Sequence, residues 1–205
     1  AQAMAAGVDC ETEVVQGLSV HDRIVEESER IGADLIVVGR RGRRALARMM
    51  IGDATLKLIG SAHCSVLVVP RAAEVRGRRF VVASDGSRFG DSAAVAAGSL
   101  AKLCEAPVTV VSVAVPSHAE ARRKEAPAVV ERIVRALASD GIAAQGEVRE
   151  GPAADVIVSA ALENGADLII MGSHGRTGIE RLVLGSNTQR VLNRTPCAVL
   201  VVKAA

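Results

Sequence analysis

Ala166-Asp167-Leu168-Ile169-Ile170-Met171 runs directly into Gly172-Ser173-His174-Gly175, and after nine further residues comes Gly185-Ser186. The apolar run predicts a buried parallel strand. The sequence Ser186-Asn187-Thr188-Gln189 predicts a helix that opens with a capping box. A glycine-rich loop of this kind directs backbone N–H groups and the positive end of a helix dipole at one point, which favours phosphate.

The glycines decide between a phosphate loop and an ordinary turn. We expect Gly172, Gly175 and Gly185 to adopt positive φ angles and to keep Cβ atoms away from a bound phosphate. The Ser186 hydroxyl would add one further contact. Three glycines together with this hydroxyl favour the phosphate interpretation over simple glycine punctuation.

The same block occurs twice in the chain. Residues 34–69 align without a gap on residues 167–202, at an offset of 133 (167 minus 34). Solenoid repeats have periods of about 20–50 residues, so this spacing indicates a duplicated domain. The second copy begins at Arg79, which would place the start of the first copy before residue 1. We therefore expect a rear half-domain at 1–73, a linker at 74–78 and a complete domain at 79–205, in a fragment of a longer tandem protein.

Strands and helices alternate along the second copy, which predicts a parallel, doubly wound α/β sheet. In such sheets ligands bind beyond the carboxyl ends of the strands. The polar stretch Ser117–Glu125 leaves the same sheet edge, where it would be either a lid or a solvated loop. The expected strands are 79–83, 108–115, 143–148, 168–171 and 198–202, and the expected helices are 92–103, 129–139, 153–163 and 186–193.

The composition is that of an ordinary globular chain, with 49% hydrophobic residues, 23% charged residues and a net charge of +2. Phe80 and Phe89 are the only aromatic residues of the Phe, Tyr and Trp class, so a stacking surface for nucleic acid is not expected. No apolar run approaches the ~20 residues of a membrane helix. The four cysteines lie far apart, and we interpret them as small buried hydrophobic residues of a protein in the reducing cytosol.

The glycine spacing, the Asp85-Gly86-Ser87 turn and the closing segment Pro196–Val202 resemble the universal stress protein family. The resemblance implies a five-stranded parallel sheet in the order 3-2-1-4-5 and, in the ATP-binding branch, a bound adenine nucleotide. The ligand would be ATP, with AMP or a cyclic nucleotide as alternatives, and Mg²⁺ would be held by the phosphates. By position, Ala83 and Asp85 would flank the adenosine, Val113 would contact adenine, Met171 and Gly172 would approach the base and ribose, Gly175, Gly185, Ser186 and Asn187 would hold phosphates, and His174 and Arg176 are weaker candidates.

The first copy departs from this pattern at Asp53, where the family has Ser or Thr. Aspartate still suits a helix N-cap, but its carboxylate would repel a phosphate. Arginines at 40, 41, 43 and 44 would offset part of that repulsion. We expect a single nucleotide site per chain, in residues 79–205.

Three functions compete: a nucleotide-dependent regulatory module, a weak ATP hydrolase, and a structural pseudo-dimer that binds nothing. No phosphate-loop lysine motif is present, which argues against an enzyme. The final strands, 65–69 and 198–202, would each lie at a sheet edge, so we expect them to pair antiparallel across a pseudo-twofold axis. A homodimer is the alternative partner arrangement. The predicted strand Glu11–Gln16 would not reach the strand at 35–38.

Overall fold

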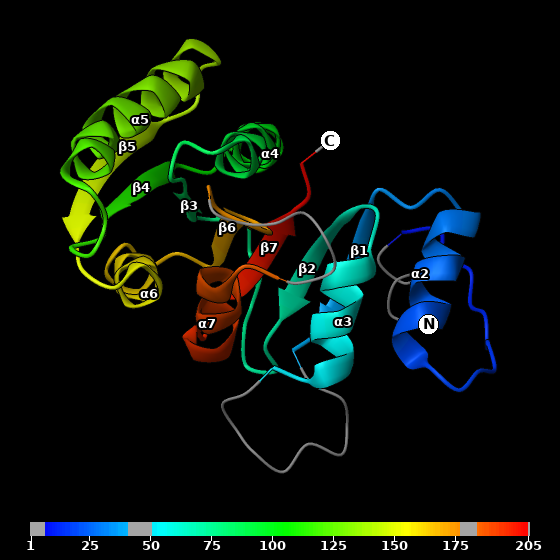
Figure 1. The fold of residues 1–205 in the computed structure, drawn as a ribbon. Helices are drawn as coiled ribbons and strands as arrows, with labels where there is room; N and C mark the ends of the chain where they lie inside the picture. The colour runs from blue at the N-terminus through cyan, green and yellow to red at the C-terminus, as the bar shows by residue number, and fades with distance from the viewer. Residues whose placement is uncertain (1–6, 41–50, 177–183, 205) are drawn as a thin grey trace.

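The computed structural model describes residues 7–40, 51–176 and 184–204 and contains one seven-stranded sheet with helices on both sides (Figure 1). Its strands lie in the order β1-β2-β7-β6-β3-β4-β5. The strands are β1 (Leu35–Gly39), β2 (Ser65–Val69), β3 (Phe80–Ala83), β4 (Val108–Ala114), β5 (Ala144–Glu150), β6 (Leu168–Gly172) and β7 (Ala198–Val202). The helices are α2 (Val20–Arg30), α3 (Asp53–Ser61), α4 (Arg88–Cys104), α5 (Glu120–Ser139), α6 (Ala153–Glu163) and α7 (Ser186–Arg194).

Both copies contribute to this one sheet, so the predicted five-stranded parallel sheet is corrected to a seven-stranded, mostly parallel one. Within residues 79–205, starting from the edge strand β5, the strands lie in the order β5-β4-β3-β6-β7. These are the third, second, first, fourth and fifth strands of that segment. Every neighbouring pair is parallel except β2 and β7, which are antiparallel. The expected pairing of the two final strands is therefore confirmed.

The register of this antiparallel pair centres the pseudo-symmetry on equivalent residues. Leu67 lies opposite Leu200, and these two leucines are equivalent under the 133-residue offset. Val66 lies opposite Val201, and Val68 lies opposite Val199. The pseudo-twofold axis thus passes between Leu67 and Leu200, and each apolar edge shields the other from water and from foreign strands.

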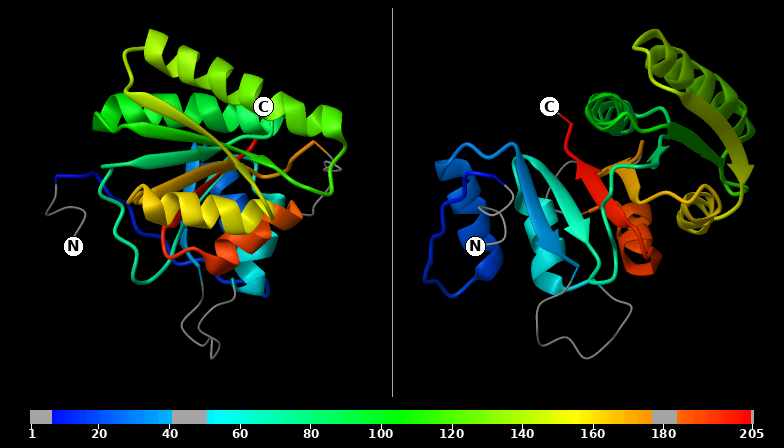
Figure 2. Two further views of the ribbon diagram at one scale, coloured as in Figure 1. Left: turned by 90° about the vertical axis from the view of Figure 1, so that its left-hand side faces the viewer. Right: turned by 180° about the vertical axis from the view of Figure 1, so that it is seen from behind.

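The strands of the second copy are buried on both faces, which explains their nearly continuous apolar sequence. Val81, Val111 and Ile169 face a core that they share with α3, α6 and α7. Phe80 and Val82 face a second core beneath α4 and α5. Figure 2 shows these two helical layers from the side and from behind.

β1 differs from these strands because only one of its faces is covered. Ile36 is buried on the side of α3, whereas Leu35 and Val37 on the other side are 43% and 59% exposed. Residues 11–16 are irregular and exposed, so the predicted Glu11–Gln16 strand is wrong. A strand needs a hydrogen-bonding neighbour, and among the described residues β1 has β2 on one edge and no strand on the other.

Two further expectations need correction. The helix expected at 129–139 begins nine residues earlier, at Glu120, and contains Pro127. Cys10 and Cys104 are exposed, whereas Cys197 is buried and Cys64 is partly buried. Burial therefore describes the last two thiols only, and for each of them desolvation raises the pKa.

The segment between the copies is irregular and is anchored at one point. The Asp167 carboxylate accepts backbone N–H groups from Arg76, Arg78 and Arg79 at 2.7, 3.1 and 3.3 Å. Because Asp167 directly precedes β6, these bonds hold the linker against the start of a central strand. No described helix is both long and apolar enough to cross a membrane.

Candidate functional site

A cavity of about 580 Å³ lies at the carboxyl ends of β3, β4 and β6. Its position agrees with the rule that ligands bind at this edge of a parallel sheet, where strand order reverses. All eleven site residues predicted from the sequence line this one cavity: Ala83, Asp85, Val113, Met171, Gly172, His174, Gly175, Arg176, Gly185, Ser186 and Asn187.

The three loop glycines have ordinary negative φ angles, so the prediction of positive φ is wrong. Their role is close approach between segments of the protein. A Cβ on Gly172 would lie 2.6 Å from the Cβ of Phe89, and one on Gly175 would lie 2.8 Å from Oδ2 of Asp85. A Cβ on Gly185 would lie 3.0 Å from the carbonyl oxygen of Ser173. Any side chain at these positions would push the loop away from its neighbours.

The predicted capping box is also wrong, because Gly185 is the N-cap of α7 and Ser186 is its first residue. The loop is closed at its base, where the Gly185 N–H donates to the carbonyl oxygen of Ser173 at 2.9 Å. The Thr188 hydroxyl donates to the carbonyl oxygen of Gly172 at 3.0 Å and fixes the first turn of α7 to the end of β6. Ser186 and Asn187, in the first turn of α7, are exposed and line the cavity.

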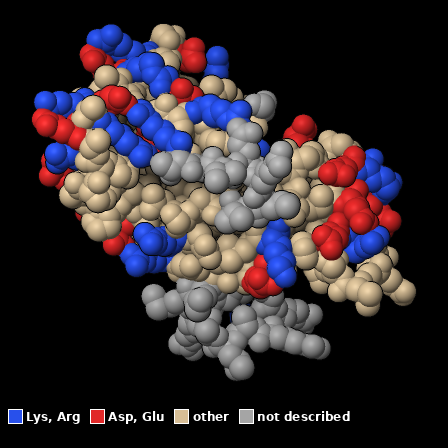
Figure 3. Space-filling model, in the orientation of Figure 1, with Lys and Arg blue, Asp and Glu red and all other residues tan. Residues whose placement is uncertain are grey.

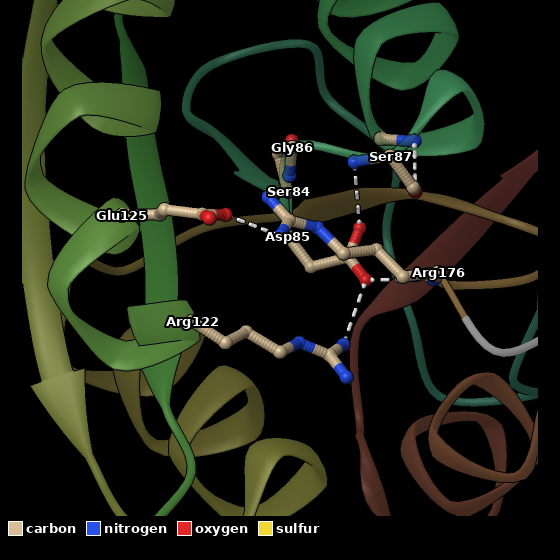
Figure 4. Close-up of polar contacts among 8 residues, drawn as sticks. Ser84, Asp85, Gly86, Ser87, Arg122, Glu125 and Arg176 are labelled. Carbon is tan, nitrogen blue, oxygen red and sulfur yellow. Dashed lines mark hydrogen bonds and ion pairs between the residues drawn. The ribbon is translucent and has the colours of Figure 1, made fainter. Parts of the chain in front are cut away.

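Asp85 is the polar centre of the cavity (Figure 4). Its carboxylate accepts the backbone N–H groups of Ser87 and Arg176 at 3.1 and 3.0 Å, and Nη2 of Arg122 lies 3.4 Å from Oδ2. Burial acts to raise the pKa of Asp85, but the hydrogen bonds from Ser87 and Arg176 and the charge of Arg122 together lower it. The carboxylate is thus held ionised between the loops that follow β3 and β6.

The first two turns of α5 form one wall of the cavity. Arg122 pairs with Asp85, and Glu125 forms an ion pair with Arg176 from the loop after β6 (Figure 4). Lys124 and Glu120 add an i,i+4 pair at 2.7 Å. These contacts connect the first turns of α5 to the loops after β3 and β6. Charged residues fit a solvated loop equally well, so the polar stretch did not predict a helix.

His174 contacts Ser173 and Phe89. Its Nδ1 lies 3.1 Å from the Ser173 hydroxyl, and its ring centre lies 5.2 Å from that of Phe89. Sequence reasoning did not name Arg122, Glu125 and His118 as site residues. Of the apolar lining it predicted the strand residues Ala83, Val113 and Met171, but it missed Val111 of β4 and the residues of α6. The missed lining residues are Ser84, Gly90, Val111, Ser112, Val115, His118, Arg122, Glu125, Ala126, Ala153, Ile157, Leu184 and Thr188.

The model of the universal stress protein family matches the chain twice, over residues 1–70 and over residues 77–203. The chain belongs to the universal stress protein family. Universal stress protein MJ0531 of Methanocaldococcus jannaschii is 32% identical in an alignment of 139 residues that covers 62% of this chain and 82% of that protein. Universal stress protein Slr1230 of Synechocystis is 29% identical over 168 residues, 82% of this chain and 57% of that protein.

Solved structures show the same fold. A protein of Pseudomonas aeruginosa described as functionally unknown, PA1789, superposes with a TM-score of 0.77 at 23% identity, covering 99% of this chain and 74% of that one. A universal stress protein solved in complex with cAMP superposes with a TM-score of 0.52 at 24% identity, covering 62% of this chain and 98% of that one. At these identities the likeness is one of fold.

Proposed function

We propose that this universal stress protein binds an adenine nucleotide in the cavity at the ends of β3, β4 and β6 and acts as a nucleotide-dependent regulatory module. The observation that carries the proposal is the division of the cavity lining into an apolar part and a polar part. Apolar side chains line part of the wall, and glycines, hydroxyls and the start of α7 line another part. This division suits a ligand with a flat apolar base and a charged tail.

The apolar part of the lining would receive the base. Val111, Val113 and Met171 come from β4 and β6, and Ile157 and Leu184 add two more aliphatic side chains. Asp85 carries a negative charge, and its acceptor oxygens suit the hydroxyl groups of a ribose or an amino group of a base. These residues would set the orientation of the nucleoside.

The start of α7 would receive the phosphates. The first N–H groups of a helix have no intrahelical acceptor, and here they belong to Ser186, Asn187 and Thr188. The positive end of the helix dipole adds to their attraction for an anion. The N–H of Gly185 already donates to Ser173, so this glycine would contribute close approach and no hydrogen bond.

A magnesium ion would depend on the phosphates for its ligands. Among the described residues, no group of three or more His, Cys, Asp and Glu side chains is placed to hold a metal ion. Asp85 and Glu125 reach the cavity wall, and both are engaged with arginine side chains. The Mg²⁺ prediction therefore concerns the nucleotide complex and requires no protein cage.

We propose a binding module in preference to an enzyme. His174 is the candidate base beside the phosphate positions, and its ring contacts Ser173 and Phe89.

A cytosolic location and the division into domains at 1–73 and 79–205 stay predictions. The repeated unit of residues 34–69 and 167–202 supports that division.

Analysis of the nucleotide released from purified protein by acid tests the proposal, followed by calorimetric titration of the emptied protein with ATP, AMP and cAMP. We include cAMP because a solved relative was crystallised with it. Saturable binding of at least one adenine nucleotide is expected, with fewer than one turnover per bound ATP over the experiment. Absence of binding by all three would overturn the proposal, and steady multiple turnover would replace the module with a hydrolase.

A further inference from the structure

A second cavity, of about 540 Å³, adjoins the first. It lies between the loop after β4, the start of α6 and one side of α7, and α6 and α7 pack against each other in Figure 1. Val115, His118, Ala153 and Asn187 line both cavities, so the two spaces meet at the first turn of α7. The second cavity is nearly as large as the first, and a single phosphate would leave most of it empty.

The lining of the second cavity has two different parts. Val115, Pro116, Pro152 and Ala154 make an apolar part. Arg190 and Arg194 bring positive charge from α7, at the helical spacing that places them with Asn187 on one side. Arg194 forms an ion pair with Asp155, which neutralises it within the protein.

Arg190 differs from its counterpart in the first copy. The equivalent residue is Lys57, whose Nζ lies 2.9 Å from Oδ2 of Asp53, four residues earlier on α3. In the second copy the residue four positions before Arg190 is Ser186, which has no charge. Within residues 7–40, 51–176 and 184–204, no hydrogen bond or ion pair engages the Arg190 side chain. Its charge is therefore available to a ligand.

A phosphate chain that starts at Ser186 would reach Arg190 by following α7. Four residues of helix advance by roughly 6 Å, so the two positions are about one turn apart. The path passes Asn187, which belongs to both cavities. Burial, with a smaller contribution from Arg122, lowers the pKa of His118, so this shared side chain is a neutral hydrogen-bonding group at neutral pH.

We infer that the second cavity binds the distal phosphates and the second nucleoside of a dinucleoside polyphosphate whose first adenosine occupies the cavity at Asp85. Arg190 binds the phosphate chain where it enters, and the apolar part formed by Val115, Pro116 and Pro152 packs against the second nucleoside. This inference rests on the proposed function, because the first adenosine uses the proposed nucleotide site.

The test measures calorimetric affinities of the full chain for AMP, ATP and diadenosine tetraphosphate. Wild-type protein is expected to bind the tetraphosphate more tightly than ATP. Arg190→Gln should weaken tetraphosphate binding by about tenfold or more, the loss of one charge-assisted hydrogen bond, and leave AMP affinity unchanged. Ser117→Trp, at an exposed position of the second cavity's lining, should remove the preference for the tetraphosphate over ATP. Lys57→Gln is the matched control and should change none of the three affinities.

The outcomes separate the two proposals. If neither AMP nor ATP binds the wild type, the proposed function fails. If both bind, but the tetraphosphate shows no preference and neither Arg190→Gln nor Ser117→Trp alters its affinity, the second site is overturned and the nucleotide site stands. If Arg190→Gln weakens ATP and the tetraphosphate equally while Ser117→Trp has no effect, Arg190 binds a terminal phosphate and the assignment of a second nucleoside is wrong.

Discussion

The two copies of the strand–loop–helix unit share equivalent hydrogen bonds in the loop but differ in charge where the helix begins. Gly52 N–H donates to the carbonyl oxygen of Arg40 at 3.0 Å, as Gly185 N–H does to Ser173 at 2.9 Å. The Thr55 hydroxyl donates to Gly39 at 3.4 Å, as Thr188 does to Gly172 at 3.0 Å. The glycine and threonine pattern therefore specifies a fold, whether or not the loop binds an anion.

The difference between the copies lies at Asp53 and Ser186. Asp53 is the first residue of α3, after its N-cap Gly52, so the prediction that Asp53 is the cap is wrong. There it places a carboxylate at the positive end of the helix dipole, which favours the helix and opposes phosphate. Ser186 leaves the same position of α7 neutral. We propose that this one side chain, on a shared backbone, determines which copy binds an anion.

The largest effect is expected where the two copies meet. Val68→Pro and Val201→Pro each remove a backbone donor from β2 or β7, which are paired on both sides. Both variants should lose compactness in small-angle scattering and become sensitive to protease. Variants that keep the parent's dimensions and protection would show that the antiparallel pair does not join the copies.

A valine at the loop glycine should distinguish the copies most clearly in binding. Gly185→Val would place side-chain atoms against Ser173 and His174, so we expect ATP affinity to fall by more than about 100-fold, close to loss of binding. Gly52→Val is the matched control and should leave ATP affinity unchanged. Thermal unfolding of both variants would show whether a folded protein was titrated, and equal losses of affinity in both would refute the assignment to the second copy.

Substitutions of Ser186 should have intermediate effects. Ser186→Ala removes one hydrogen bond to a charged group and should cost about 1.5–3 kcal/mol in ATP binding. Ser186→Asp reproduces the first copy and should weaken ATP binding further than alanine does, because the carboxylate repels phosphate. Calorimetry with ATP and with adenosine measures both, and adenosine affinity should stay constant. An aspartate variant that binds ATP like the parent would remove charge as the reason for the difference.

The smallest effect concerns Asp85, to which no described residue of the first copy corresponds. Its pKa is lowered in the folded protein, so its stabilising contribution is present above the unfolded value of about 4 and is lost as pH falls through the folded value. The free-energy advantage of wild type over Asp85→Asn in urea unfolding should therefore shrink between pH 6 and pH 3. An advantage that is constant across this range would contradict the lowered pKa.

On the face of the molecule shown in Figure 3, the described residues form no large patch of one charge sign that would distinguish the two copies. Blue and red side chains are interspersed over α5 and again over the region of α2. Most of the ion pairs there involve exposed side chains, such as Arg135 with Glu131 and Arg30 with Glu13. Such pairs contribute little to stability.

The eleven site residues line one cavity. Glycine spacing and strand ends are local signals that pointed to the loop after β6 and to Asp85, and the resemblance to the universal stress protein family supplied the remaining positions. The sequence also predicted the bounds of α6 and β7 correctly. The sign of φ at Gly172, Gly175 and Gly185 was not predictable, since glycine serves close approach as well as positive φ. The start of α5 was not predicted, and its first turns form ion pairs with Asp85 and Arg176, which lie far away in sequence.

Burial in both copies was equally hard to predict from local sequence. Residues 11–16 have the composition of a strand but no partner among the described strands, and a strand is defined by its partner. Cys10 and Cys104 were expected to be buried from residue type alone, yet both are exposed. Local pattern identified elements and the site, whereas tertiary contacts determined their ends and their burial.

Calorimetric stoichiometry of ATP on the unmodified chain tests most directly the claim that one copy binds nucleotide and the other does not. We predict one site per chain, which Ser186→Asp weakens and Lys57→Gln leaves intact. Two equivalent sites per chain would contradict the role assigned to Asp53, and a single site unaffected by Ser186→Asp would place the nucleotide outside the cavity at α7.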